Sequence, residues 1–148
     1  MFQPCFVAMV YFMSELKTYV TAALIGFCYA SPVVALPYSP SQRAELFANC
    51  AGRLSALEEH QRMFDGPASE VTRSAVRHFE ALLEAVMPDA IAYGMPGRQV
   101  WSWRVNAKHA QSLLLNKATF SQDGRLLERA QMASDQYISE CENLVLGV

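Results

Sequence analysis

Apolar residues recur at intervals of three and four in four stretches of this chain, each about 20 residues long. Turn-forming residues separate the stretches: Asp65-Gly66-Pro67, a segment at 88–97 with two prolines and two glycines, and the run from Ser121 to Gly124. No segment alternates apolar and polar residues over the length of a useful strand. Four helices with short connections indicate an all-α fold, an up-down-up-down four-helix bundle.

The ends of the expected helices carry local signals. The first helix is expected to begin at Pro40, with Ser39 as its N-cap and Gln42 completing a capping box, and to end near Phe64. The second runs from about 67 to 87, where Pro88 stops it. The third and fourth run from about 98 to 118 and from about 124 to 146.

One apolar face of each helix is expected to form the core. In chain order, the residues of the four faces are Phe47, Cys50, Leu54, Leu57 and Phe64; Val71, Ala75, Phe79, Leu82 and Val86; Val100, Trp103, Ala107, Ala110 and Leu114; and Leu126, Ala130, Ala133, Tyr137, Cys141 and Leu144.

The N-terminal segment differs sharply from the rest in charge. Residues 1–42 contain only Glu15 and Lys17 as charged side chains, and an apolar run follows Lys17. With Val33 and Ala35 at the −3 and −1 positions, this pattern predicts a signal peptide over 1–35, cleaved after Ala35, and a mature helical domain over 36–148. Met13 is a second candidate start. The alternative is an uncleaved membrane anchor, because the run from Thr18 to Leu36 is about long enough to span a bilayer.

The cysteines support export. Two of the four, Cys5 and Cys28, lie in the segment expected to be removed, which leaves Cys50 and Cys141 as the only pair. Both lie on expected core faces of the first and fourth helices, which are antiparallel neighbours in a simple bundle. We therefore predict a disulfide between them in an oxidising compartment, the periplasm or the exterior. Two buried free thiols are the alternative.

Signatures of catalysis are missing from the sequence. It contains no His-Glu-x-x-His, no Gly-x-Ser-x-Gly and no glycine-rich phosphate loop. Glu80 and Glu84 share a helix face, but Arg77 is placed to pair with them, as on an ordinary solvated surface. A net charge of −2 gives no indication of the basic surface that proteins use to bind nucleic acid. No catalytic residue and no cofactor are predicted.

Three residues could form a metal or haem site. His78, His109 and Met132 fall at about the same level of an antiparallel bundle, and His with Met suits haem iron or copper. The interpretation we favour is structural: two histidines at the edge of the core and a methionine that fills a gap in it.

The run Trp101-Ser102-Trp103-Arg104 is the most distinctive local sequence. If Trp103 faces the core, Trp101 lies on its flank, because residues two apart do not share a helix face. Trp101 is expected to close the end of the bundle over the 88–97 loop. The alternative is a contact surface formed by Tyr93, Trp101 and Arg104.

The runs Cys50 to Ala56 and Gly66 to Glu70, the pair Trp103-Arg104 with Ala107-Lys108, and the late Cys141 resemble a group of short exported proteins of alphaproteobacteria. The resemblance covers roughly residues 45–145. It implies export and a helical fold, and no activity.

Together these observations predict a non-enzymatic exported helical protein that acts as a binding or accessory module, with a protein as its partner. A haem- or copper-binding bundle is one alternative. A membrane-tethered accessory subunit is another, if the N-terminal segment stays uncleaved.

Overall fold

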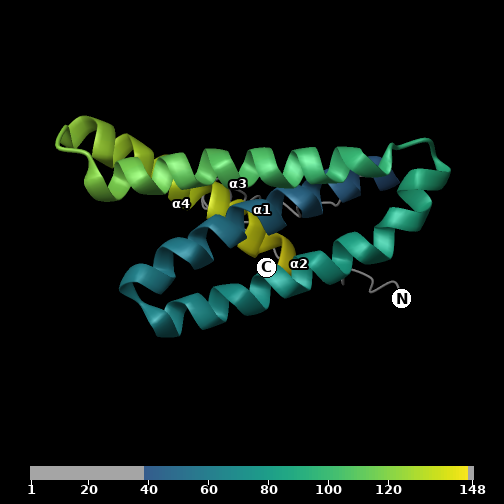
Figure 1. The fold of residues 1–148 in the computed structure, drawn as a ribbon, viewed down its shortest axis with the longest axis horizontal. Coiled ribbons are helices and arrows are strands. Elements are labelled where there is room, and N and C mark those ends of the chain that lie inside the picture. The colour runs from purple at the N-terminus through teal and green to yellow at the C-terminus, as the bar shows by residue number, and fades with distance from the viewer. Residues whose placement is uncertain (1–38, 147–148) are drawn as a thin grey trace, which may run out of the picture. The chain divides into compact units, whose positions relative to one another are not determined.

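The computed structural model describes residues 39–146, which form four helices and no strand (Figure 1). They are α1 (Pro40–Phe64), α2 (Gly66–Ala92), α3 (Gly97–Phe120) and α4 (Gly124–Leu146). Successive helices run in opposite directions, so the expected up-down-up-down bundle is confirmed. None of these helices combines the length and the apolar character that a bilayer crossing requires. The signal peptide predicted over 1–35, with Met13, Cys5 and Cys28, lies outside the described residues.

The first turns of α1 and α2 are capped differently from each other. Ser39 has the extended backbone of an N-cap, and its carbonyl accepts the first helical hydrogen bond from the N–H of Arg43 at 3.0 Å. Its side chain makes no capping bond, so the capping box predicted with Gln42 is wrong. The start of α2 does have a side-chain cap, because Oδ1 of Asp65 accepts a hydrogen bond from the N–H of Ala68 at 3.1 Å.

Pro88 does not stop α2, contrary to the sequence-based prediction. The helix continues to Ala92, and Figure 1 shows its end bending toward the start of α3. A proline inside a helix removes one hydrogen bond and bends the axis. The extra turn is stabilised by a Schellman end, in which Gly94 has a φ of +92° and the N–H of Met95 donates to the carbonyl of Ala90 at 3.0 Å. Ala90 and Met95 are both buried, so this end closes the core.

Helix α1 is the centre of the bundle. It packs extensively on both α2 and α3, whereas its contact with α4 is small. Small residues make this possible, because Ala44, Ala48 and Ala51 are completely buried and let neighbouring backbones approach closely. At Gly52 the approach is closest: a Cβ there would lie 3.1 Å from the backbone nitrogen of Lys108 and closer still to the carbonyl oxygen of Arg104. The side chains of Phe47, Leu54 and Phe79 complete the core beside this seam.

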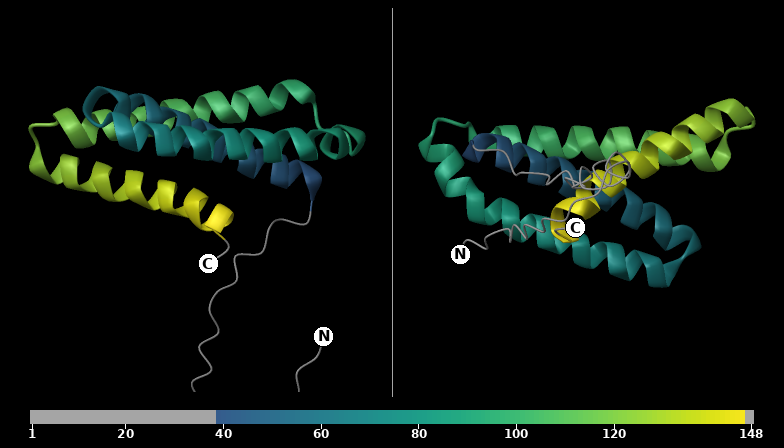
Figure 2. Two further views of the ribbon diagram at one scale, coloured as in Figure 1. Left: turned by 90° about the horizontal axis from the view of Figure 1, so that it is seen from below. Right: turned by 180° about the vertical axis from the view of Figure 1, so that it is seen from behind.

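Helix α4 packs mainly on α3 and meets α1 around the disulfide. Figure 2 shows α4 leaving the end of α3 at an angle and crossing α1. Cys50 and Cys141 are disulfide-bonded, with Cα atoms 5.5 Å apart, which confirms the predicted pair. Close to it, the guanidinium of Arg53 lies 4.2 Å from the centre of the Tyr137 ring and 3.5 Å from a carboxylate oxygen of Glu140. Helices α1 and α4 are therefore joined at one place rather than lying side by side along their length.

In α2, α3 and α4, the buried face is shifted by about one residue along the sequence from the predicted face. Val71, Ala110, Leu126 and Tyr137 were expected in the core and are exposed. Between residues 124 and 144 of α4, the buried residues are Ala130, Ser134, Ile138 and Cys141. The polar Ser134 is buried because its Oγ accepts a hydrogen bond from Nε2 of Gln111 on α3 at 2.8 Å. Phe64 was also expected in the core, and it is 61% exposed.

A charged network joins the ends of α1 and α2. The buried Glu58 accepts hydrogen bonds from Arg73 at 3.0 and 3.2 Å and lies 3.2 Å from Nε of Arg62. Arg73 also donates to Glu70. The hydrogen bond to Glu58, followed by the charge of Glu70, raises the pKa of Arg73, so its guanidinium stays charged. The network gives a buried carboxylate the partners that its desolvation requires.

Candidate functional site

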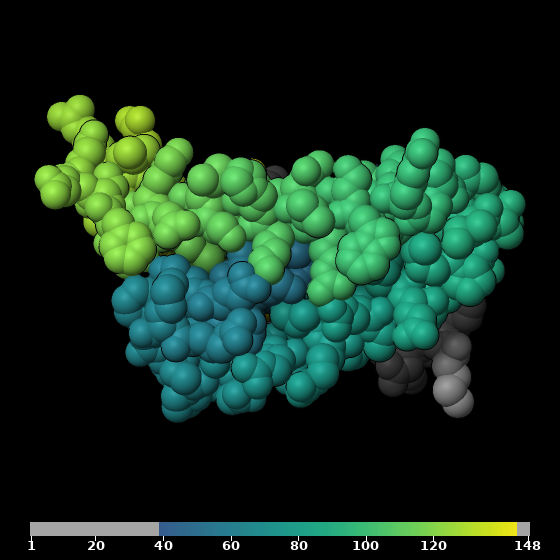
Figure 3. Space-filling view, in the orientation of Figure 1, coloured from purple at the N-terminus to yellow at the C-terminus, as the bar shows by residue number. Residues whose placement is uncertain are grey.

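A groove runs between α2 and α3, because both helices pack on α1 and make little backbone contact with each other. Its volume is about 270 Å³, and Figure 3 shows the surface hollowed between the green α3 and the teal α2. The Pro88 bend and the short connection at 93–96 bring the two helices together at one end, and from there they diverge. The groove thus forms because α2 and α3 diverge from each other while both pack on α1.

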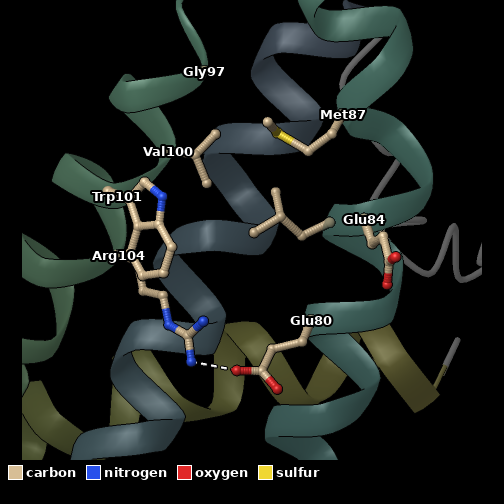
Figure 4. Close-up of a pocket in the computed structure, with 8 residues that line it drawn as sticks. Glu80, Glu84, Met87, Gly97, Val100, Trp101 and Arg104 are labelled. Atoms are coloured by element: carbon tan, nitrogen blue, oxygen red, sulfur yellow. Dashed lines mark hydrogen bonds and ion pairs between the residues drawn. The ribbon is translucent and has the colours of Figure 1, made fainter.

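The floor of the groove is apolar and one end of it is charged. Met87 of α2 and Val100 of α3 project toward one another in Figure 4, and Leu83 of α2 also lines the groove. At one end, Arg104 and Glu80 form an ion pair across the groove. Gly97, which has no side chain, lies at the other end.

Trp101 forms one wall of the groove, and its side chain is 67% exposed. It does not close the end of the bundle, which was the role we expected from the sequence. Trp103, by contrast, is half-buried and packs against the core, so its predicted place on the core side of α3 is confirmed. An exposed indole beside an apolar floor is a typical anchor for a binding partner.

The predicted contact residues are only partly brought together. Trp101 and Arg104 both line the groove, whereas Tyr93 does not and is 79% exposed in the loop beyond it. The sequence did not reveal the contribution of Glu80 and Met87, because their spacing on α2 says nothing of the helix that faces them. It also assigned Glu80 to Arg77, whereas the structure pairs Glu80 with Arg104.

Glu84 lies on the opposite side of the groove from Trp101 (Figure 4). Its side chain is exposed, and within residues 39–146 no ion pair involves it. With Glu80 and Arg104 neutralising each other, Glu84 leaves the rim of the groove with one net negative charge. The arrangement can therefore hold an apolar group and attract a cationic one.

The three candidate metal ligands do not form an enclosed site. His78, His109 and Met132 are all exposed, and the side chain of Met132 is 57% accessible. The prediction that the two histidines edge the core and that the methionine fills a gap in it is wrong. Within the described part of the chain, no three His, Cys, Asp or Glu residues are grouped to bind a metal ion.

A second hollow of about 410 Å³ lies between α1, α3 and α4. It is more polar than the groove, and its lining includes His60, Ser134, Asp135 and Glu142. Nε2 of His60 is within hydrogen-bond distance of the Thr119 hydroxyl at 2.8 Å, and Asp135 accepts from Gln131. Because His60, Ser134 and Asp135 already have partners, we regard the α2–α3 groove as the better candidate site.

Comparisons of the chain with protein-family models, with curated proteins and with solved structures find no match. The candidate site therefore rests on its own geometry.

Proposed function

We propose that this protein is an exported helical binding protein without catalytic activity, which holds a segment of a protein partner in the α2–α3 groove. The observation that supports the proposal best is Trp101, an indole 67% exposed on the wall of an apolar groove. Large aromatic side chains at such positions commonly supply most of the energy of a protein contact.

The chemistry of the groove indicates what kind of segment it would bind. The floor of Leu83, Met87 and Val100 suits aliphatic side chains, and the free carboxylate of Glu84 suits a basic residue beside them. An amphipathic helix can present both on one face, and a channel between two helices accommodates this mode of binding.

Export is supported by two features. Cys50 and Cys141 form a disulfide between helices, which is typical of proteins that fold outside the reducing cytosol. The apolar segment that precedes the described residues has the charge pattern of a signal peptide. We place the protein in the periplasm or outside the cell.

Site-directed photo-crosslinking in the native envelope tests the groove. A photoreactive amino acid in place of Gly97, an exposed residue that lines the groove, is expected to give a discrete protein adduct, and one in place of Met132, which is also exposed but lies on α4, is not. The substitution Trp101→Ala or Met87→Asn in the Gly97 crosslinking chain should remove the adduct. Equal adducts from both positions, or an adduct that survives both substitutions, would contradict the proposal.

A further inference from the structure

Helix α3 differs from the rest of the described chain in charge. It carries four basic side chains and no acidic one, while the other described residues carry seven basic and thirteen acidic side chains. Arg104 and Lys108 are paired with Glu80 and Glu59 on neighbouring helices. Arg98 and Lys117, near the two ends of α3, are exposed, and none of the ion pairs within residues 39–146 involves them.

The solvent-facing side of α3 also concentrates exposed apolar residues. We define the outer face of α3 by exposed residues spaced three or four apart: Arg98, Trp101, Val105, His109, Leu113, Lys117 and Phe120. Trp101, Val105, Leu113 and Phe120 have between 46% and 67% of their surface accessible.

Neighbouring segments extend this surface at both ends of α3. Ile91 lies beside Gly97, with its Cδ1 3.9 Å from the position of a Cβ there, and the exposed Tyr93 follows it. At the other end, the ring centres of Phe64 and Phe120 are 6.4 Å apart. Of the twelve large apolar residues exposed in the described part of the chain, seven lie on α3 or at its ends.

We propose that the outer face of α3 binds the surface of an anionic lipid membrane. A helix of 24 residues is about 36 Å long, and its two basic residues outside ion pairs, Arg98 and Lys117, lie near its ends with apolar and aromatic residues spread between them. This is the pattern of a helix that lies in a membrane interface, with aromatic and aliphatic side chains at the headgroup level and basic side chains near lipid phosphates.

The spread of these residues favours a lipid surface over a protein. Contacts between proteins concentrate their energy in a central cluster that fits a pocket. The apolar residues of the outer face are instead distributed along the whole helix. Contact between two α3 helices would place like charges together, so charge complementarity disfavours a second copy through this face. The inference goes beyond the proposed function, because the outer face shares only Trp101 with the lining of the groove.

The test is sedimentation of the purified protein with vesicles of phosphatidylglycerol and phosphatidylcholine in equal parts, compared with vesicles of phosphatidylcholine alone. We expect binding that requires phosphatidylglycerol. The double variant R98Q/K117Q should bind about 30-fold more weakly, at about fivefold for each basic residue near the surface. The matched control R125Q/R129Q removes the same charge from exposed positions on α4 and should bind like the unchanged protein.

A second readout locates the contact. The chain has two tryptophans, so the variant Trp103→Phe reports on Trp101 alone. Brominated lipid in the anionic vesicles should quench its fluorescence, and Leu113→Asn should weaken both quenching and sedimentation. Circular dichroism checks that each variant is folded.

Four results would overturn the proposal: equal binding to both kinds of vesicle, no binding to either, equal losses in the two double variants, or an unquenched Trp101. Polyglutamate serves as a probe for acidic proteins. Binding to polyglutamate that R98Q/K117Q weakens, without binding to anionic vesicles, would assign the outer face to an acidic protein partner and overturn the lipid proposal.

Discussion

Gly52 is the residue on which the close approach of α1 to α3 depends, because a side chain there would meet the backbone of Arg104 and Lys108. Backbone atoms cannot move aside as a flexible side chain can. Any substitution at Gly52 therefore has to separate α1 from α3, one of the two helices on which α1 packs extensively.

Gly52→Ala is expected to lower the free energy of unfolding by about 1–3 kcal/mol, the usual cost of an overpacked core. Urea unfolding followed by circular dichroism measures it. Gly124→Ala is the matched control, because a Cβ at Gly124 meets nothing within 4 Å. If the two variants were equally stable, the close approach at Gly52 would not exist.

Glu58 and Glu59 are adjacent glutamates with different surroundings. Glu58 is buried and accepts hydrogen bonds from Arg73, whereas Glu59 is exposed and pairs with Lys108 at 2.6 Å. We expect Glu58→Gln to cost about 1–3 kcal/mol, since it weakens the interactions of a buried group. Glu59→Gln should cost about 0–1 kcal/mol, as for an exposed pair. Thermal unfolding of both variants at neutral pH compares them, and the reverse order would refute the network.

At the scale of the elements, the contact between α3 and α4 has a polar centre. Gln111 and Ser134 are 1% and 2% exposed, and Oε1 of Gln111 has no partner within residues 39–146. Their hydrogen bond selects the face that α4 presents to α3. It also explains why Ile138, and not Tyr137, lies in the core.

A double-mutant cycle tests this contact. Ser134→Ala should destabilise the protein by about 1–3 kcal/mol, because it leaves Nε2 of the buried Gln111 without a partner. Adding Gln111→Leu should recover most of that loss, since the pair is then replaced by apolar groups. Strictly additive effects of the two substitutions would mean that the hydrogen bond does not form.

The sequence predicted features of this fold that depend on local pattern, and it failed where a neighbouring helix decides. The limits of α4 and the cysteine pair follow from periodicity, turn residues and the number of cysteines. The core position of Ser134 depends on Gln111 of another helix, and the continuation of α2 past Pro88 depends on the buried Ala90 and Met95 beyond it. For the candidate site, Trp101 and Arg104 could be singled out as unusual, but Glu80 and Met87 become part of it only when α2 lies opposite α3.

At the scale of the whole molecule, the disulfide joins α4 to the central helix at a place where the two helices otherwise share few contacts. It closes a loop between cysteines 91 residues apart in the sequence. The chain-entropy estimate for such a loop is about 4–5 kcal/mol. The disulfide therefore contributes a large part of the stability expected of a small domain.

Reduction, or the variant Cys50→Ser/Cys141→Ser, is expected to release α4 before the other helices. Hydrogen exchange should then be fastest in amides of α4, with those of α1 and α2 still protected. Uniform loss of protection over all four helices would show that α4 is integral to the core. Unchanged protection would show that the disulfide contributes nothing to the attachment of α4.

The central claim, an exported bundle clamped by a disulfide, is tested most directly by the intact mass of the protein isolated from its native envelope. The protein is unfolded without reductant in the presence of iodoacetamide, so that any free thiol is alkylated. We predict the mass of a chain that begins at Leu36, with neither Cys50 nor Cys141 alkylated. A chain carrying two alkyl groups on these cysteines, or one that retains Met1, would contradict the account.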